Sequence, residues 1–585
     1  MQVRMAGFVF FLAVVSVFPA CMTVEERRAA DNGETAWCGE DSDCPSGLEC
    51  HLESHLCALP DLVELDAALR LVPPSEGMVA VEEQYPQMVV NNRDPLNLKM
   101  HRPIQINGRV LLQGAPLVSS QQAHIVAVAP GDIPGLSLHQ EAKALQTSYT
   151  TGDGTTRTGF EFQVMEDSVY DIYVHLSQAE MGEVPPVHVR RSFSPKPGSS
   201  EPFQLEWDIE VPDFDQYLVV TGTVVSLEDP PSPVQSAKVV GFSQDTGNIT
   251  STGVTNAAGE FTVLVPPPAD VQGEDLSFQV RPSLDNELVP SAVFDDIQVK
   301  EDMELGELTV GSLANLVPVT VLVADEAGIF TPQTLGGTVV RFSGGEDGSQ
   351  FLVERTVSSQ SQVAFSLPPG TYVLSVVPPA YSTLGIHQEL LKIDGNGESG
   401  QSVQVALQSK PRIHGWVLDP QGAELARAHV VATFTGKGVY PDTAPLATRK
   451  VDAWSDDSGH YEMNLDPGQY SLVIDPPAGS GLPRRVLRNV FVSNSQQRTL
   501  RISYPVLVTG RIDGYQVDST VNEAGETIET FELREAGGVR VELFNSGDLS
   551  ENEQEVPIPT ATGTTDSQGR FTLIVPADAD LESTP

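Results

Sequence analysis

The chain contains 585 residues, with 34 Lys and Arg against 79 Asp and Glu, which gives a formal net charge of −45. A chain of this length exceeds what one hydrophobic core supports, so we expect roughly four to six domains. Such an acidic surface repels phosphate backbones and argues against nucleic acid as a partner. The 49 Gly and 44 Pro favour many turns over long helices.

The N-terminus has the pattern of an export signal. Arg4 precedes an apolar run from Met5 to Ala20, which is too short to span a bilayer comfortably. The stretch "VFPAC", which ends at Cys21, resembles the lipobox of bacterial lipoproteins, although Phe18 and Pro19 depart from the preferred Leu and small residue. The resemblance implies that residues 1–20 are removed and that diacylglycerol is attached to Cys21. A plain secreted protein and an uncleaved membrane anchor are the alternatives.

All five cysteines lie in the first tenth of the chain. With Cys21 set aside as the lipid carrier, residues 21–60 keep an even set: Cys38, Cys44, Cys50 and Cys57. Because an exported chain meets an oxidising environment, we predict that these four form disulfides, and all three pairings stay open. The stretch resembles short cysteine-rich modules near the N-termini of myxobacterial-type lipoproteins.

Metal is the rival explanation for these cysteines. Structural zinc sites usually use ligand pairs two to four residues apart, a spacing that these cysteines lack. The nearby "HLESH" also fails the metalloprotease pattern, because Glu53 does not directly follow His51. We therefore predict neither a metal nor another cofactor.

Residues 61–103, which include "LVPPSEGMVAVEEQYP", indicate a semi-rigid linker with at most one strand. Beyond it the chain repeats itself. "LPPGTYVLSVVPP" from Leu367 matches "LDPGQYSLVIDPP" from Leu465 at seven of thirteen positions, and "TNAAGEFTVLVP" from Thr255 matches "TDSQGRFTLIVP" from Thr565 at six of twelve. A polar turn ending in Gly, an apolar strand, a Pro-Gly turn and a second strand stopped by Pro-Pro predict a β-hairpin.

Each unit also opens with a strand, such as "VTGTVVS" at Val220 and "IHGWVLD" at Ile413. The units recur every 95 to 114 residues, which suits a β-sandwich. The pattern resembles the carboxypeptidase regulatory-like domain family, and this implies transthyretin-like, immunoglobulin-type sandwiches without peptidase chemistry. We expect an all-β chain with sandwiches at 104–200, 201–310, 311–408, 409–503 and 504–585. The last one lacks at least one strand, which implies either a fragment of a longer protein or a trimmed domain with an open edge.

Catalytic motifs are missing from the sequence, which contains no nucleophile elbow, His-Glu-x-x-His or phosphate-binding loop. The eleven histidines are scattered, and His124, His175 and His429 fall in strand-like runs where we expect ordinary satisfied or exposed side chains. Asp394–Glu398 and Ser455–Gly459 place oxygen ligands around turn glycines without fitting an EF-hand, so calcium is a minor alternative. We predict that the chain is not an enzyme.

These features predict a lipoprotein anchored in an outer membrane, facing the periplasm or the surface, whose sandwiches extend outward as an acidic rod. A structural or adhesion stalk is the first hypothesis. A carbohydrate-binding protein is the second, although Trp416 and Trp454 occupy strand positions where we expect core packing. An accessory subunit of a peptidase or secretion complex is the third. The expected partners are the membrane, through the lipid, and envelope proteins or polysaccharide.

Overall fold

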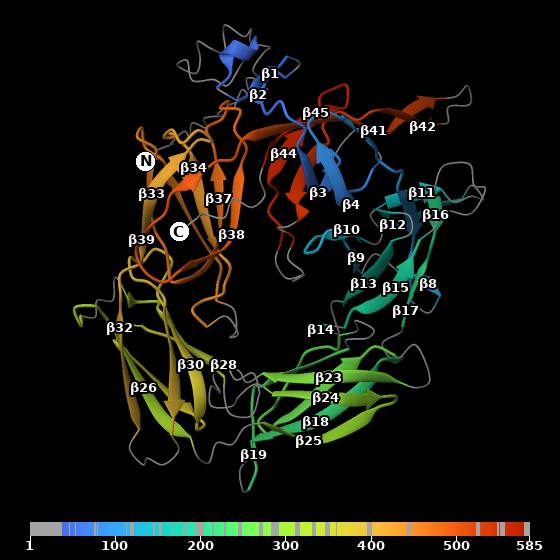
Figure 1. The fold of residues 1–585 in the computed structure, drawn as a ribbon. Coiled ribbons are helices and arrows are strands. Elements are labelled where there is room, and N and C mark those ends of the chain that lie inside the picture. The colour runs from blue at the N-terminus through green and yellow to red at the C-terminus, as the bar shows by residue number, and fades with distance from the viewer. Residues whose placement is uncertain are drawn as a thin grey trace, which may run out of the picture.

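The computed structural model describes residues 38–577 except for short internal segments. The segments left out are 46, 53, 75–77, 79, 113, 118–121, 144–146, 151–154, 166–167, 179–181, 184, 194–203, 213–215, 227–229, 244–248, 268–272, 282–291, 311–315, 330–334, 345–351, 359, 395–399, 441–445, 522–526, 547–548 and 550–555. The described chain folds as a small N-terminal module and five β-sandwiches (Figure 1). The predicted all-β class with tandem sandwiches is confirmed.

The second sandwich shows the common plan. Its strands are β18 (Leu218–Ser226), β19 (Ser232–Pro233), β20 (Lys238–Phe242), β21 (Gly253–Val254), β22 (Glu260–Val265), β23 (Glu274–Arg281), β24 (Ala292–Val299) and β25 (Met303–Val310). In one sheet the first strand, β18, pairs antiparallel with β22 and parallel with the last strand, β25. The facing sheet has the order β21-β20-β23-β24.

The third and fourth sandwiches repeat this plan. The third contains β26 (Val317–Asp325), β27 (Val339–Gly344), β28 (Leu352–Thr356), β29 (Gln362–Leu367), β30 (Gly370–Val377), β31 (His387–Ile393) and β32 (Gln401–Leu407). The fourth contains β33 (Arg412–Leu418), β34 (His429–Phe434), β35 (Arg449–Trp454), β36 (His460–Asn464), β37 (Gly468–Asp475), β38 (Arg485–Val492), β39 (Gln496–Gln497) and β40 (Leu500–Arg501). Their four-stranded sheets have the orders β28-β27-β30-β31 and β35-β34-β37-β38.

The first sandwich runs past its predicted end at residue 200. Its strands are β6 (Ile104–Gly108), β7 (Val110–Leu112), β8 (Ala115–Pro116), β9 (Gln122–Pro130), β10 (Ser137–Lys143), β11 (Thr147–Thr150), β12 (Thr156–Val164), β13 (Val169–Gln178), β14 (Gly182–Glu183), β15 (Val187–Ser192), β16 (Gln204–Glu206) and β17 (Ile209–Val211). Because β16 and β17 pair parallel with β6 and β7, they form the last strand of this unit and not the start of the next.

A glycine in the first strand makes room for an aromatic ring in the neighbouring strand. Gly222 pairs with Phe261, and a Cβ on Gly222 would lie 2.8 Å from the Phe261 Cζ. The fourth and fifth sandwiches repeat the pair of glycine and aromatic residue. In the third, Val321 faces Val363, so the glycine and the ring are replaced together. The repeated Gly and Phe or Tyr are thus one packing unit.

A buried hydroxyl explains the Thr or Ser that opens the repeated turn. The Thr255 Oγ1 accepts a hydrogen bond from the Ala237 N–H at 2.8 Å and donates one to the Val234 carbonyl at 2.7 Å. Ser455 and Thr565 bridge the corresponding backbone groups in the fourth and fifth sandwiches. The side chain therefore satisfies two backbone groups that would otherwise be buried without partners.

The fifth sandwich is assembled from both ends of the chain. Its C-terminal strands are β41 (Pro505–Val521), β42 (Thr527–Glu535), β43 (Arg540–Asn545), β44 (Ala561–Thr564) and β45 (Arg570–Pro576), and its N-terminal strands are β3 (Glu64–Val72), β4 (Glu83–Asn91) and β5 (Leu96–Lys99). The sheet order β4-β3-β43-β44 gives β3 and β4 the places that β23 and β24 hold in the second sandwich. β5 pairs parallel with β41, which is the place of β25.

Residues 61–103 are therefore not a linker. Their strands contribute Leu69, Leu71 and Val90 to the same core as Val541 and Leu573, and all five side chains are fully buried. The predicted open edge of the fifth unit is wrong for the same reason, because β3, β4 and β5 fill the strand positions that seemed to be missing.

The N-terminal strands that complete the fifth sandwich join the two ends of the chain and close the sandwiches into a ring. Residues 100–103 lead from β5 of the fifth sandwich into β6 of the first, while residues 502–504 lead from the fourth into β41 of the fifth. Figure 1 shows β3 and β4 beside β44, with the other four sandwiches arranged in a loop. The expected extended rod is thus replaced by a closed arrangement.

Buried contacts fix the first sandwich against the fifth. Ala68 and Phe544 of the fifth sandwich form a small apolar cluster with Ile133 of the first. The Gln84 Oε1 accepts a hydrogen bond from the Ile133 N–H at 2.9 Å. Residues 100–103, which connect β5 to β6, are also fixed, because the buried Glu83 carboxylate accepts a hydrogen bond from the His101 N–H. Burial raises the pKa of this carboxylate.

A buried carboxylate of the fourth sandwich contacts the third sandwich. Asp466 of the fourth sandwich is 2% exposed and accepts a hydrogen bond from the Ile386 N–H of the third at 3.1 Å. Its carboxylate also contacts the Arg449 Nη1 at 2.8 Å and the Lys410 Nζ at 3.6 Å, and Lys410 donates to the Ala380 carbonyl. A buried carboxylate needs such partners, and the Arg449 partner belongs to the fourth sandwich itself. Separating the two domains would therefore keep this ion pair but would remove the hydrogen bonds from Ile386 to Asp466 and from Arg449 to the Pro378 carbonyl.

Candidate functional site

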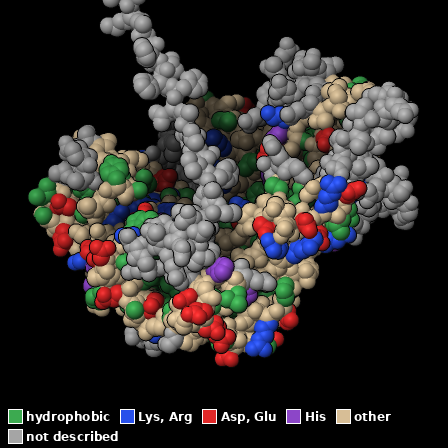
Figure 2. All heavy atoms as spheres, turned by 90° about the horizontal axis from the view of Figure 1, so that it is seen from above, with side chains coloured by type: hydrophobic (Ala, Val, Ile, Leu, Met, Phe, Trp, Pro, Cys, Tyr) green, Lys and Arg blue, Asp and Glu red, His purple; other side chains and the backbone are tan. Residues whose placement is uncertain are grey.

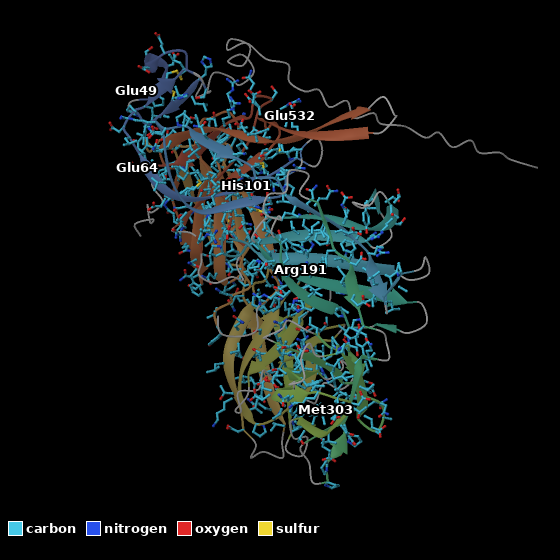
Figure 3. All side chains as sticks on the ribbon, turned by 90° about the vertical axis from the view of Figure 1, so that its right-hand side faces the viewer. Glu49, Glu64, His101, Arg191, Met303 and Glu532 are labelled. Atoms are coloured by element: carbon cyan, nitrogen blue, oxygen red, sulfur yellow. A yellow bond between two sulfur atoms is a disulfide. The ribbon has the colours of Figure 1, made fainter. Side chains whose placement is uncertain are left out.

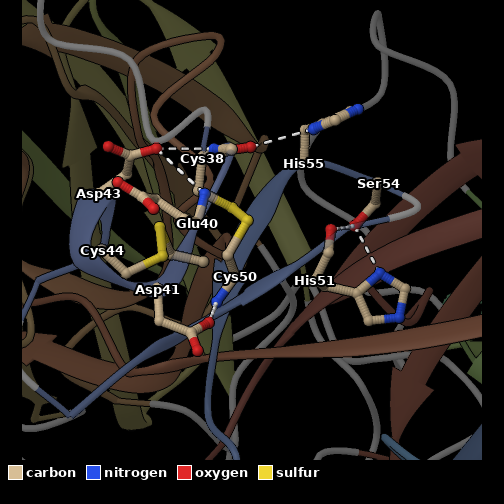
Figure 4. Close-up of a disulfide and its surroundings, with 11 residues drawn as sticks. Cys38, Glu40, Asp41, Asp43, Cys44, Cys50, His51, Ser54 and His55 are labelled. Atoms are coloured by element: carbon tan, nitrogen blue, oxygen red, sulfur yellow. Dashed lines mark hydrogen bonds between the residues drawn. A yellow bond between two sulfur atoms is a disulfide. The ribbon is translucent and has the colours of Figure 1, made fainter.

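Two disulfides hold the N-terminal module together. Figure 4 shows the one between Cys38 and Cys50. The module contains η1 (Asp41–Asp43) and a hairpin of β1 (Glu49–His51) and β2 (Leu56–Ala58). Cys50 and Cys57 face each other in this hairpin. Cys50 is bonded to Cys38 and Cys57 to Cys44, with Cα–Cα distances of 5.6 and 5.5 Å. The structure thus selects one of the three pairings that the spacing left open.

Polar contacts supply most of the remaining order in the module. The Asp41 Oδ1 accepts the Cys50 N–H at 2.8 Å, and the Asp43 Oδ2 accepts the Gly39 N–H at 2.7 Å. Among the described residues of the module, the buried apolar cluster consists of Cys38, Leu48 and Cys57. A module with so small a core depends on covalent crosslinks.

The sulfur atoms of Cys38, Cys44 and Cys57 lie within 4.8 Å of one another, which is close enough for a metal site. All three belong to disulfides, so no thiolate is left to bind zinc. The histidines of the module have other contacts, since the His51 Nδ1 lies 2.9 Å from the Ser54 Oγ and the His55 Nδ1 lies 3.0 Å from the Cys38 carbonyl. The geometry fits a disulfide-linked module.

The module is attached to the fifth sandwich at the start of β41. The Leu59 N–H donates to the Pro505 carbonyl at 3.2 Å, and Tyr504 packs against the cysteine cluster. The Asn92 Nδ2 donates to the Leu59 and Asp61 carbonyls at 3.0 and 2.8 Å. Both parts of the split sandwich therefore hold the module. Figure 3 shows Glu49 of the module and Glu64 of β3 at one end of the molecule, with Met303 at the other.

The predicted lipidation residue, Cys21, and the apolar run Met5–Ala20 lie outside the described residues. Among the residues that the structure describes, no helix is long and apolar enough to cross a bilayer.

The prediction of core packing is wrong for Trp454, whose side chain is 62% exposed. The residue ends the edge strand β35, in which no residue is fully buried. Its ring stacks on His429 with centroids 4.3 Å apart, and the His429 Nε2 lies 3.2 Å from the Asp452 Oδ2. Trp416 is half-buried and meets His460 edge-on at 5.5 Å. Trp454 is exposed because it lies on an edge strand, a position that its strand-like sequence does not reveal.

Strand pairing gathers histidines that are scattered in the sequence. His124 of β9 faces His175 of β13, and the neighbouring strand β10 adds His139 and Glu141. The His139 Nε2 lies 2.8 Å from one Glu141 oxygen, and the His124 Nε2 lies 3.3 Å from the other. Burial and, to a lesser extent, His124 lower the pKa of His175, while the hydrogen bond from His139 is the main cause that lowers the pKa of Glu141. The expected half-buried or exposed side chains are found, and the strand pairing adds a proximity of His124 and His175 that the separate strand sequences do not show.

The carboxylate in Ser455–Gly459, the stretch considered for calcium, has a structural task. The Asp456 Oδ1 accepts the backbone N–H groups of Ser458 and His460 at 2.9 and 3.0 Å. Asn256 caps the matching turn with a neutral amide. Hydrogen bonding within the turn therefore accounts for this Asp or Asn without a cation. Most of Asp394–Glu398 lies outside the described residues.

Comparisons with known proteins show distant likenesses only. No family model and no curated protein matches the chain. A streptococcal ancillary pilin covers 49% of this chain and 99% of its own, at 11% identity and a TM-score of 0.20. The Bacillus anthracis TIE protein covers 76% of this chain and 75% of its own, at 10% identity and a TM-score of 0.16. The minor pilin GBS52 of Streptococcus agalactiae covers 32% and 96%, at 15% and 0.19. Likenesses this low carry no argument about function.

The disulfide pairing can be tested by peptide mapping without reduction. A protease that cuts after Asp and Glu separates all four cysteines, because Glu40, Glu49 and Glu53 lie between them. We expect peptides linked through Cys38 and Cys50 and through Cys44 and Cys57, and a link between Cys38 and Cys44 would contradict the structure. The double variant Cys44→Ser/Cys57→Ser should destabilise the module by about 2–4 kcal/mol, measured by thermal or denaturant unfolding.

Proposed function

We propose that this chain is a non-enzymatic lipoprotein of the cell envelope that holds a ring of β-sandwiches at a membrane surface for a structural or adhesion role. The observation that carries the proposal is the position of the cysteine module. It sits on the fifth sandwich, which is also the one that closes the ring. A lipid on Cys21 would therefore tether the whole ring through its closing domain.

Chain length limits how far the ring can stand from the membrane. Cys21 precedes Cys38 by 17 residues, and at 3.3–3.6 Å per residue these reach at most about 60 Å. A tethered ring of this kind presents the outer faces and edges of several sandwiches to neighbours, instead of a single distal tip. The formal charge of −45 keeps such a body soluble. Figure 2 shows acidic side chains spread over the visible face and interspersed with Lys and Arg.

The anchor can be tested on the full chain in a Gram-negative-type host. The N-terminal peptide recovered from membrane fractions should begin at Cys21 and carry a diacylglyceryl or triacyl adduct, measured by mass spectrometry. The variant Cys21→Ser should move the protein to the soluble fraction, whereas the control Ser54→Ala, which removes a half-buried hydroxyl beside His51 and leaves both disulfides in place, should stay in the membrane. An unmodified start elsewhere, or membrane retention of Cys21→Ser, would overturn the lipoprotein proposal.

Carbohydrate binding is a second candidate function, and the exposure of Trp454 favours it. A flat ring that is 62% exposed and backed by His429 offers an apolar surface for the face of a sugar. Asp452, which contacts His429, places a hydrogen-bond acceptor beside it.

This second candidate predicts retention on one or more of cellulose, chitin and dextran gels. Trp454→Ala should weaken that retention at least fivefold without changing the thermal midpoint, because the side chain lies outside the core. Tyr381→Ala serves as the matched control, since Tyr381 is another exposed aromatic residue, at 77%. Absence of retention on every gel, or equal loss in both variants, would rule the candidate out.

A further inference from the structure

One outer face of the first sandwich carries an unusual concentration of metal-ligating side chains. Burial alternates along β9 and β13, so that His124 and His175 point away from the core while their neighbours Ile125 and Val174 are fully buried. The two histidines are directly opposite each other in the antiparallel pair. Side chains in such a pair start about 4.5–5.5 Å apart at Cβ, which lets both rings reach one point above the sheet.

Glu141 brings a carboxylate to the same point. It lies on β10, which pairs with β9 on the side away from β13. The Glu141 Oε2 is 3.3 Å from the His124 Nε2. Ligand atoms 2.0–2.1 Å from a tetrahedral zinc ion are about 3.3–3.4 Å apart, so these two atoms already have the separation that the ion requires.

A further histidine holds the carboxylate in place. The His139 Nε2 lies 2.8 Å from the Glu141 Oε1, which is the oxygen that His124 does not contact. Outer hydrogen bonds of this kind orient metal ligands and contribute to affinity. The three nearest polar groups thus form a chain from His139 through Glu141 to His124.

The His175 ring completes the set after a rotation. The His124 and His175 ring centroids are 6.4 Å apart, and among the described residues the three ligand atoms do not yet lie within 4.8 Å of one another. Because the side chain of His175 is exposed, its ring can turn toward the ion without disturbing the core. Lys143, the partner of His124 on β10, is also exposed, and its long side chain can extend into water.

From this geometry we propose that His124, Glu141 and His175 form a binding site for zinc or a similar divalent transition-metal ion, with His139 positioning Glu141 and water completing the coordination. Two imidazoles and one carboxylate are a ligand set that suits such ions. Binding would join β9, β10 and β13 on the outside of the sheet.

A second histidine pair in the same molecule serves as an internal control for the proposed site. His414 and His460 of the fourth sandwich have ring centroids 6.0 Å apart, close to the spacing of His124 and His175. Glu462, which faces His414 in the strand pair, is bound instead to Arg412 at 2.5 Å. Because a guanidinium already engages this carboxylate, we assign the pair no strong site.

The test is calorimetric titration of the full chain with Zn²⁺ in excess Mg²⁺, which occupies isolated surface carboxylates. We expect one strong site per chain and a higher thermal midpoint with Zn²⁺ than with chelator. His175→Ala and His124→Ala should each weaken binding at least tenfold. His460→Ala should bind Zn²⁺ like the unmodified protein.

Folding of the variants is checked by the thermal midpoint in chelator, and His175→Gln, which keeps a polar side chain but not the imidazole, provides a second version. The proposal would be overturned if the unmodified chain had no strong site, if His175→Ala and His175→Gln kept full affinity, or if His460→Ala lost affinity to the same extent.

Discussion

The antiparallel pairing of β3 with β43 is the interaction on which the rest of the structure depends. It joins Arg70 to Glu542 across 472 positions of the chain, and it buries Leu69 and Leu71 against the strands of the C-terminal half. Without it, the fifth unit would be an open half-sandwich with unpaired strand edges, which is an aggregation hazard. The entropic cost of closing so long a loop grows only slowly with its length, so one well-packed core can offset it.

Closure also changes which surfaces the protein would present under the proposed lipid anchor. In a linear chain of sandwiches the first domain lies next to the anchor and the last is the most distant. Here the module that follows the predicted anchor sits on a sandwich that touches the first domain through Ile133 and is joined to the fourth through residues 502–504. Hydrogen bonds from the Ile386 N–H to the buried Asp466 and from Arg449 to the Pro378 carbonyl fix the third domain to the fourth. The molecule is therefore a closed ring whose domains are fixed by contacts with their neighbours, and not a linear series of independent domains.

Local features of the fold could be predicted from the sequence, whereas features that depend on strand neighbours could not. Several turn residues recur because each supports hydrogen bonds close by in the chain: the turn glycines, the Thr or Ser before them, and the Pro-Gly-x-Tyr turn. Tyr372 and Tyr470, for example, donate to the carbonyls of Pro368 and Asp466. The split sandwich was missed because its pairing spans the chain. One signal was present: Leu71-Val72-Pro73-Pro74 ends β3 as Pro378-Pro379 and Pro476-Pro477 follow β30 and β37. The exposed Trp454 and the facing His124 and His175 depend on register and sheet position, which no single strand reveals.

The closure itself is tested most directly by a disulfide between the two ends of the chain. Arg70 and Glu542 are register partners, and Cα atoms of directly opposed antiparallel residues lie about 4.5–5.5 Å apart, within disulfide range. We predict that Arg70→Cys/Glu542→Cys forms this bond on mild oxidation, seen as one linked peptide pair by mass spectrometry, while the control Arg70→Cys/Glu462→Cys does not. Free thiols at residues 70 and 542 in the folded protein, or equal crosslinking in the control, would contradict the ring.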